Sequence, residues 1–143
     1  VRSTAYAACS ASSAVANQGP FSAMTDLVGD GPGGLLAVAV VVGTRRFIQL
    51  DAIIGLVSSV AYGQCNLYIR EGVTVVGTAF CNMDGAINWR TTLPVKGIVD
   101  SPTPGTHTYK VSAEFTGGGS VTISASSSQT AFLLVQDIGL ASP

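Results

Sequence analysis

The C-terminal segment, residues 104–139, constrains the fold most strongly, because its polar and apolar side chains alternate with the period of β-strands. Within residues 106–115 every second side chain is apolar or aromatic: Tyr109, Val111, Ala113 and Phe115. Three glycines at 117–119 permit a chain reversal and residues 120–125 alternate again, so these two segments are predicted to form a hairpin. Residues 131–138 are apolar on both faces, which predicts a strand covered on both sides, by a second sheet or by another subunit.

Clusters of Gly, Pro, Asn and Asp divide the chain from residue 25 onward into strand-sized segments. The predicted strands are residues 35–42, 46–60, 64–71, 73–81, 86–99, 106–115, 120–125 and 131–138. No segment shows a convincing amphipathic helical period. We therefore predict an all-β protein, specifically an eight-stranded antiparallel jelly-roll sandwich, although strand count alone leaves an immunoglobulin-like sandwich open.

The 143 residues are enough for one domain with one core. Residues 1–24 are dominated by Ala and Ser without a period, and we expect an extended N-terminal arm there that docks on a neighbour or is disordered. The sandwich is predicted to span 25–139, with a short tail at 140–143. We expect no signal peptide and no transmembrane helix, because the most apolar run, 35–42, is too short to span a bilayer and follows no basic stretch.

Charge and hydropathy bear on the partners of the chain. Only 10% of the residues are charged and the net charge is −1, which argues against binding to nucleic acid and gives no electrostatic attraction to an anionic membrane. With 47% hydrophobic residues, such a chain favours self-association, and we predict a homotrimer. Two strands, 46–60 and 131–138, carry apolar residues on both faces. They supply the predicted trimer contacts: Ile53, Val57, Phe132, Leu133 and Val135.

Several strings of the sequence resemble a known family. They are PGTHTYKV at 104–111, VTISA at 121–125, FLLVQDIG at 132–139, STAYA at 3–7 and NLYIREG at 66–72. These strings are similar to small minor tail and other virion structural proteins of tailed phages that infect actinobacteria. The resemblance runs along most of the chain, and none of the strings is catalytic. It implies a jelly-roll like that of tail-fibre knobs, on the surface of a particle assembled in the cytoplasm of a bacterial host.

No constellation of catalytic or metal-binding residues is evident. The single histidine, His107, has no nucleophile motif beside it, and the acidic residues are scattered. Asp26 and Asp30 flank a glycine-rich loop that could hold calcium, but regular ligand spacing is missing. Cys65 and Cys81 are expected to be small buried thiols, with a disulfide between them as the less favoured alternative. We expect no enzyme activity, no metal and no cofactor.

Two functions follow as hypotheses. The first is a non-enzymatic virion structural protein that decorates the capsid or forms a tail-tip or fibre knob, contacts other virion proteins and has a role in host attachment. The alternative is a carbohydrate-binding module that recognises a host cell-wall glycan. Its candidate contacts are Tyr68 and Arg70, which lie on the outward face of one strand, together with Asn88 and Trp89. For both Trp89 and the Tyr68–Arg70 pair, an ordinary structural position is the competing interpretation.

Overall fold

The computed structural model describes residues 9–19, 21–58, 64–82, 89–116, 121–124 and 131–140, and this part of the chain is all-β. It contains ten strands, paired antiparallel, and one 3-10 turn, η1 (Pro32–Gly34). The strands are β1 (Cys9–Ser13), β2 (Thr25–Asp26), β3 (Ala37–Val42), β4 (Arg46–Ser58), β5 (Gln64–Glu71), β6 (Thr74–Asn82), β7 (Trp89–Asp100), β8 (Gly105–Thr116), β9 (Val121–Ser124) and β10 (Ala131–Leu140). Among the described residues, no helix could cross a membrane.

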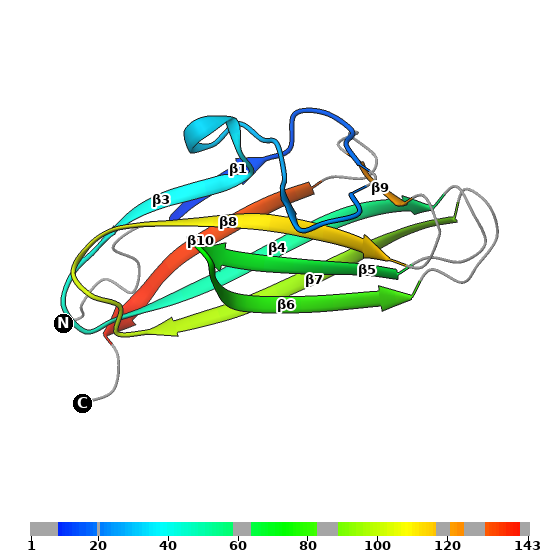
Figure 1. Ribbon diagram of the computed structural model, residues 1–143. Coiled ribbons are helices and arrows are strands. Elements are labelled where there is room, and N and C mark those ends of the chain that lie inside the picture. The colour runs from blue at the N-terminus through cyan, green and yellow to red at the C-terminus, as the bar shows by residue number, and fades with distance from the viewer. Residues whose placement is uncertain are drawn as a thin grey trace.

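Eight of the strands form two layers, which Figure 1 shows one behind the other. One layer has the order β1, β10, β4, β7, and the other has the order β3, β8, β5, β6. Along the chain, these eight strands alternate between the two layers at every step except from β5 to β6, which are neighbours in the same layer. This connectivity is that of a jelly-roll sandwich. The two short strands extend the layers, since β9 pairs with β4 beyond the end of β10 and β2 pairs with β8 beyond the end of β3.

The two layers are continuous along one seam, where β6 meets β7 at a single residue pair, Gly77 and Gly97. A Cβ atom at Gly77 would lie 2.6 Å from the carbonyl oxygen of Lys96, and one at Gly97 would lie 2.5 Å from the carbonyl oxygen of Val76. Real Cβ atoms do not approach carbonyl oxygens so closely. Glycine at both positions is therefore what lets the sheet turn this corner.

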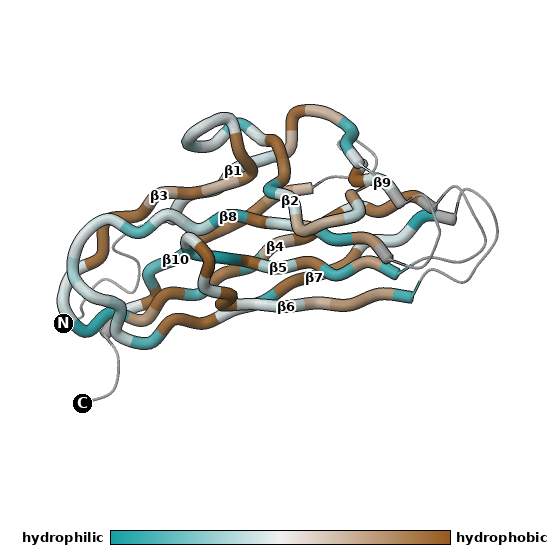
Figure 2. The backbone as a smooth tube through the Cα atoms, in the orientation of Figure 1, coloured by the Kyte–Doolittle hydropathy of each residue, from teal (hydrophilic) through white to brown (hydrophobic). Residues whose placement is uncertain are grey.

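The core lies between the layers and consists of alternate side chains from the long strands. On β4 the inward residues are Ile48, Leu50, Ala52, Ile54 and Leu56, each at most 1% exposed. Tyr109, Val111 and Ala113 of β8 face them from the opposite layer and have no exposed surface. Figure 2 shows hydrophobic residues recurring along these strands. The apolar set that alternation singles out over residues 106–115 is therefore the inward face of β8.

Two sequence-based expectations differ from the structure. Residues 9–13, which we expected in an extended arm, form β1 and pair with β10 from Cys9 opposite Gln136 to Ser13 opposite Phe132. The predicted hairpin between residues 106–115 and 120–125 is wrong, because β8 pairs with β5, β3 and β2, whereas β9 pairs with β4 in the other layer. Local alternation cannot reveal that the chain changes layer between two strands. The glycines at 117–119 lie outside the described residues.

Candidate functional site

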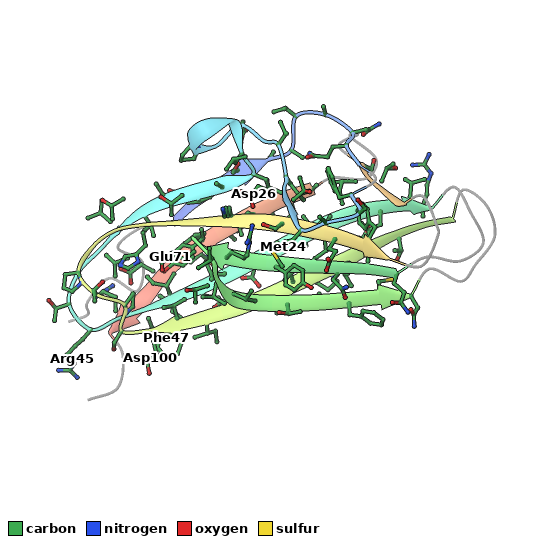
Figure 3. All side chains as sticks on the ribbon, in the orientation of Figure 1. Met24, Asp26, Arg45, Phe47, Glu71 and Asp100 are labelled. Atoms are coloured by element: carbon green, nitrogen blue, oxygen red, sulfur yellow. The ribbon has the colours of Figure 1, made fainter. Side chains whose placement is uncertain are left out.

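The outer face of the β1–β10–β4–β7 layer is the principal candidate for a contact surface. Since β4 turns one set of alternate residues into the core, it turns the other set outward, and these include Phe47, Ile53 and Val57. All three are only partly buried. Figure 3 shows Phe47 with Asp100, its partner in the register, at one end of this layer.

The strand register arranges apolar side chains on this face in rows. One row runs from Phe132 on β10 through Ile53 on β4 to Pro94 on β7. Leu134 lies on the same side of β10, and Ile98, at 59% exposure, lies on the same side of β7. We call this surface the β4 outer face, and it comprises Phe47, Ile53, Val57, Pro94, Ile98, Phe132 and Leu134.

The β4 outer face also carries polar side chains, because Gln136 lies opposite Gln49 and Lys96 opposite Asp51, while Arg90 and Asp100 lie at its two ends. Asp51 accepts a hydrogen bond of 2.8 Å from Gln49 Nε2 and lies 3.5 Å from Lys96 Nζ. Lys96 is 77% exposed, and exposed ion pairs of this length contribute little to stability. The face therefore presents an apolar row between polar groups, and such a mixture of apolar and polar side chains is found at protein interfaces.

The predicted trimer contacts divide between the two sides of this layer. Ile53, Val57 and Phe132 belong to the β4 outer face, as the sequence suggested. Leu133 and Val135 have no exposed surface and belong to the core of a single chain, so they cannot contact another copy. On β10 the outward-facing set is the alternate one, Phe132 and Leu134, because only one parity of a strand faces outward.

A second cluster of functional groups lies on the outer face of the opposite layer, where β2, β5 and β8 are neighbours. Arg70 Nη2 lies 2.6 Å from Asp26 Oδ1, and Lys110 Nζ donates to Asp26 Oδ2 at 2.9 Å. Ser112 Oγ donates to Asp26 Oδ1 at 2.7 Å and accepts a hydrogen bond of 2.9 Å from Arg70 Nε. Figure 3 shows Asp26 on this side of the molecule. The cluster attaches the two-residue strand β2 to the body of the sheet.

The charge of Asp26 is strongly favoured in this cluster. Burial alone raises the pKa of Asp26, but hydrogen bonds from Lys110, Ser112 and Arg70 outweigh it and lower the pKa to about 2. With two cations around one carboxylate, all three ionic side chains have partners within the cluster. Arg70, predicted as a contact residue, is therefore 15% exposed and engaged in an internal network.

Tyr68 shares this outer face with exposed residues of β6. Tyr68 lies opposite Thr78, and the neighbouring pair is Asn66 with Phe80, whose side chain is 53% exposed. The two aromatic side chains are thus diagonal neighbours on one face of the sheet. Trp89 begins β7 in the other layer, its side chain lies outside the described part of the structure, and so does all of Asn88. Of the four predicted glycan contacts, the described residues therefore place only Tyr68 and Arg70, which lie on one outer face of β5.

His107 connects two loops at the end of the sandwich where β7 is followed by β8. Its Nδ1 contacts Glu71 Oε2 at the end of β5, and its Nε2 lies 2.6 Å from the carbonyl oxygen of Thr103. Because both ring nitrogens face acceptors, the protonated imidazolium fits best. The Thr103 carbonyl raises the pKa of His107, burial opposes this, and Glu71 adds to the rise. The ring also stacks on Tyr109, with centroids 6.3 Å apart.

Tyr109 and Asp137 place polar atoms beside the core. The Tyr109 hydroxyl is buried and has no hydrogen-bond partner among the described residues. Burial, with a smaller contribution from the charge of Glu71, raises the pKa of Tyr109 to about 12. Asp137 is 1% exposed and accepts hydrogen bonds of 2.8 and 2.9 Å from Arg46 Nε, one to each oxygen. This ion pair joins the first residue of β4 to the C-terminal end of β10.

Asp26 and Asp30, considered above as calcium ligands, do not converge. Asp26 lies in the Arg70 cluster, whereas Asp30 Oδ1 accepts hydrogen bonds from Ser12 Oγ at 2.9 Å and from the Ser13 backbone at 2.8 Å. Asp30 thereby fastens β1 to the loop before η1. Within the described ranges, no group of three or more His, Cys, Asp or Glu side chains is placed to hold a metal ion.

Comparisons with known proteins add little to this geometry. No protein-family model matches the sequence. No curated protein matches it either. Among solved structures, the Eiger TNF of S. frugiperda aligns with a TM-score of 0.42 and 9% sequence identity, over 70% of this chain and 63% of that one. A likeness this distant says nothing about function. What the strand pairing itself defines is a protein of the β-sandwich class with jelly-roll connectivity.

Proposed function

We propose that this chain is a non-enzymatic structural protein of a phage particle, which trimerises and lies exposed on the particle surface. The observation that carries the proposal is the β4 outer face, where Phe132, Ile53 and Pro94 form an apolar row on the outside of a complete sandwich. A single copy has no further element among its described residues to cover this row. Other copies of the chain, or other virion proteins, are its proposed partners.

The chemistry of the β4 outer face supports self-association over binding to a charged partner. Lys96 is paired with Asp51, and the apolar row of Phe132, Ile53 and Pro94 lies between this pair and Arg90 near the start of β7. Burial of apolar surface is worth about 25 cal/mol per Å², so covering several such side chains from three copies stabilises an assembly substantially. Threefold symmetry closes a ring of identical contacts and leaves no face for unlimited growth.

The particle itself enters the proposal through the resemblance described above. The strings NLYIREG and PGTHTYKV lie in β5 and β8, and each lies mainly in regular strand. In this proposal the protein is a capsid decoration or the knob of a tail tip or fibre. A role in attachment to the host would then belong to its exposed surfaces.

Carbohydrate binding is a second candidate function, and one observation favours it. Tyr68 and Phe80 lie on one outward face with Asn66 beside them, and aromatic rings flanked by amides are typical of sugar-binding surfaces. A glycan array compared for the wild type and Phe80→Ala tests this function. Val73→Ala is the matched control, because Val73 is 90% exposed but lies in the turn between β5 and β6. Glycan binding lost only in Phe80→Ala supports this function, and no binding by the wild type contradicts it.

The virion proposal is tested on purified particles. Antibodies raised against the chain and labelled with gold should mark intact particles at regular surface positions in electron micrographs. Mass spectrometry of the same particles should find the chain in multiples of three copies. Particles that lack the chain, or labelling only after disruption, would contradict a surface role.

A further inference from the structure

Cys65 and Cys81 face each other across the β5–β6 pair. They are directly opposite in the antiparallel register, and both side chains point to the core side. Cys65 is completely buried, whereas Cys81 is partly exposed, and both are present as thiols. The sequence separates them by residues 66–80, so only the register of the folded sheet shows that they are neighbours.

The backbone geometry of such a pair suits a disulfide. Opposite residues of an antiparallel pair have Cα atoms about 4.5–5.5 Å apart, within the range of about 4.4–6.8 Å that disulfides span. Their Cβ atoms, about 4.5–5.5 Å apart, need to close by up to about 1 Å. A pair of strands near the margin of a sheet can make that adjustment.

The position of β6 in the sheet gives an oxidant access. On its far side β6 pairs with β7 only at Gly77, within the described residues, and Cys81 lies four residues beyond that point. No strand among the described residues pairs with this edge of β6 at Cys81. Cys65, in contrast, lies between Cys81 on β6 and Phe115 on β8.

We propose that Cys65 and Cys81 are a redox modification site, at which a small disulfide oxidant such as oxidised glutathione converts the two thiols into a cross-strand disulfide. In the first step the Cys81 thiolate attacks one sulfur of oxidised glutathione, which forms a mixed disulfide and releases one glutathione thiolate. In the second step Cys65 loses its proton and attacks Cys81 Sγ, which releases the second glutathione. Two protein thiols are oxidised, and one glutathione disulfide is reduced to two thiols.

The two steps should differ in rate. Burial, and then the proximity of Cys81, raise the pKa of Cys65, so its thiolate is scarce at neutral pH. The partly exposed Cys81 thiol reacts first with oxidised glutathione. The attack of the buried Cys65 thiol on the mixed disulfide is the slower step, and an alkaline pH accelerates it. The cross-link closes a loop of 15 intervening residues between β5 and β6. This should raise the Tm by roughly 5–10 °C.

The experiment uses the intact protein with oxidised glutathione at pH 7 and pH 8.5, followed by alkylation of the remaining thiols and peptide mapping. The expected product is a peptide pair joined through Cys65 and Cys81, formed faster at pH 8.5, with a higher Tm that returns to its starting value after reduction. Cys9→Ser, which keeps both thiols of the pair, should behave like the wild type.

The variant Cys81→Ser should show no Tm rise after the same treatment. Because mapping of the wild-type protein is decisive by itself, the test does not depend on how any variant folds. A glutathione adduct that remains on Cys81, a disulfide that involves Cys9, or two unreacted thiols at pH 8.5 would each overturn the proposal.

Discussion

The ionic cluster around Asp26 makes a quantitative prediction about acid stability. Its hydrogen bonds to Lys110, Ser112 and Arg70 lower the pKa of Asp26 from 3.8 to about 2 in the folded protein. A carboxyl group whose pKa is lowered on folding stabilises the protein above its unfolded value and loses that contribution as the pH falls through the folded one. The shift corresponds to roughly 2 kcal/mol, an upper figure because the side chain is 27% exposed and salt screens it.

Replacement of this carboxylate should therefore matter at neutral pH and not in acid. For Asp26→Asn we expect a free energy of unfolding roughly 2 kcal/mol lower at pH 6, which moves the urea midpoint by roughly 1 M. The difference from the wild type should close between pH 3.8 and about 2. Urea denaturation at one fixed protein concentration measures it, since self-association would make stability concentration-dependent.

A matched carboxylate provides the control for this measurement. Asp100 is exposed and accepts a hydrogen bond from the adjacent Ser101 Oγ, so Asp100→Asn should leave the midpoint nearly unchanged at every pH. If Asp26→Asn and the wild type lost stability in parallel from pH 6 to pH 2, the cluster would not hold Asp26 in the way described, and the reasoning would be refuted.

Three further changes test other parts of the fold. Gly77→Ala should lower the free energy of unfolding by about 1–3 kcal/mol, because its Cβ would lie 2.6 Å from a carbonyl oxygen of β7. Gly43→Ala should cost far less in the same urea titration, because the nearest atom to its Cβ would be 3.9 Å away, on the Arg46 side chain. The protonated His107 side chain stabilises the fold fully below pH 6.5, and this contribution is lost as the pH rises through the raised pKa of His107. His107→Asn should therefore lower the Tm at pH 5.5, and the Tm values of the two proteins should converge as the pH is raised to 8.5. Leu133→Ala should lower the free energy of unfolding by about 2–5 kcal/mol, because Leu133 is fully buried. Phe132→Ala, on the outer face, should lower it less in protein kept monomeric by dilution. Equal losses would contradict the inward and outward sides assigned to β10.

Much of the fold follows from local patterns in the sequence. The alternation over residues 106–115 identifies the inward face of β8 correctly, and all eight predicted strands correspond to strands of the structure within a few residues. Periodicity of side chains is a local property, so the sequence carries it directly. The continuous apolar stretch of β10 is ambiguous for the same reason, and only the structure decides that Leu133 and Val135 face inward.

Pairing between distant strands could not be read from those patterns. The strand β1 consists of Ala, Ser and Cys, residues without strong β-preference, and it forms because the edge of β10 and the Asp30 carboxylate provide partners for its backbone. The short β9 matches the alternation of a hairpin partner but lies in the other layer. Tertiary pairing overrides local preference in both cases.

The candidate sites show the same limit. Arg70 was identified as outward-facing from its strand, but its partner Asp26 is 44 residues away and lies on a strand of two residues that has no pattern of its own. His107 and Glu71 are separated by 36 residues. Such residues meet only because the strand register places β5 beside β8, and the local sequence pattern does not contain that register.

The central claim is that copies of this chain cover one another's β4 outer face. The most direct test is the mass of the intact protein in solution, measured by light scattering during size-exclusion chromatography, for the wild type and for Ile53→Asp. We predict a wild-type mass three times that of the 14.5 kDa chain, and a folded monomer for Ile53→Asp. A wild-type protein that stays a monodisperse monomer at high concentration would contradict the claim.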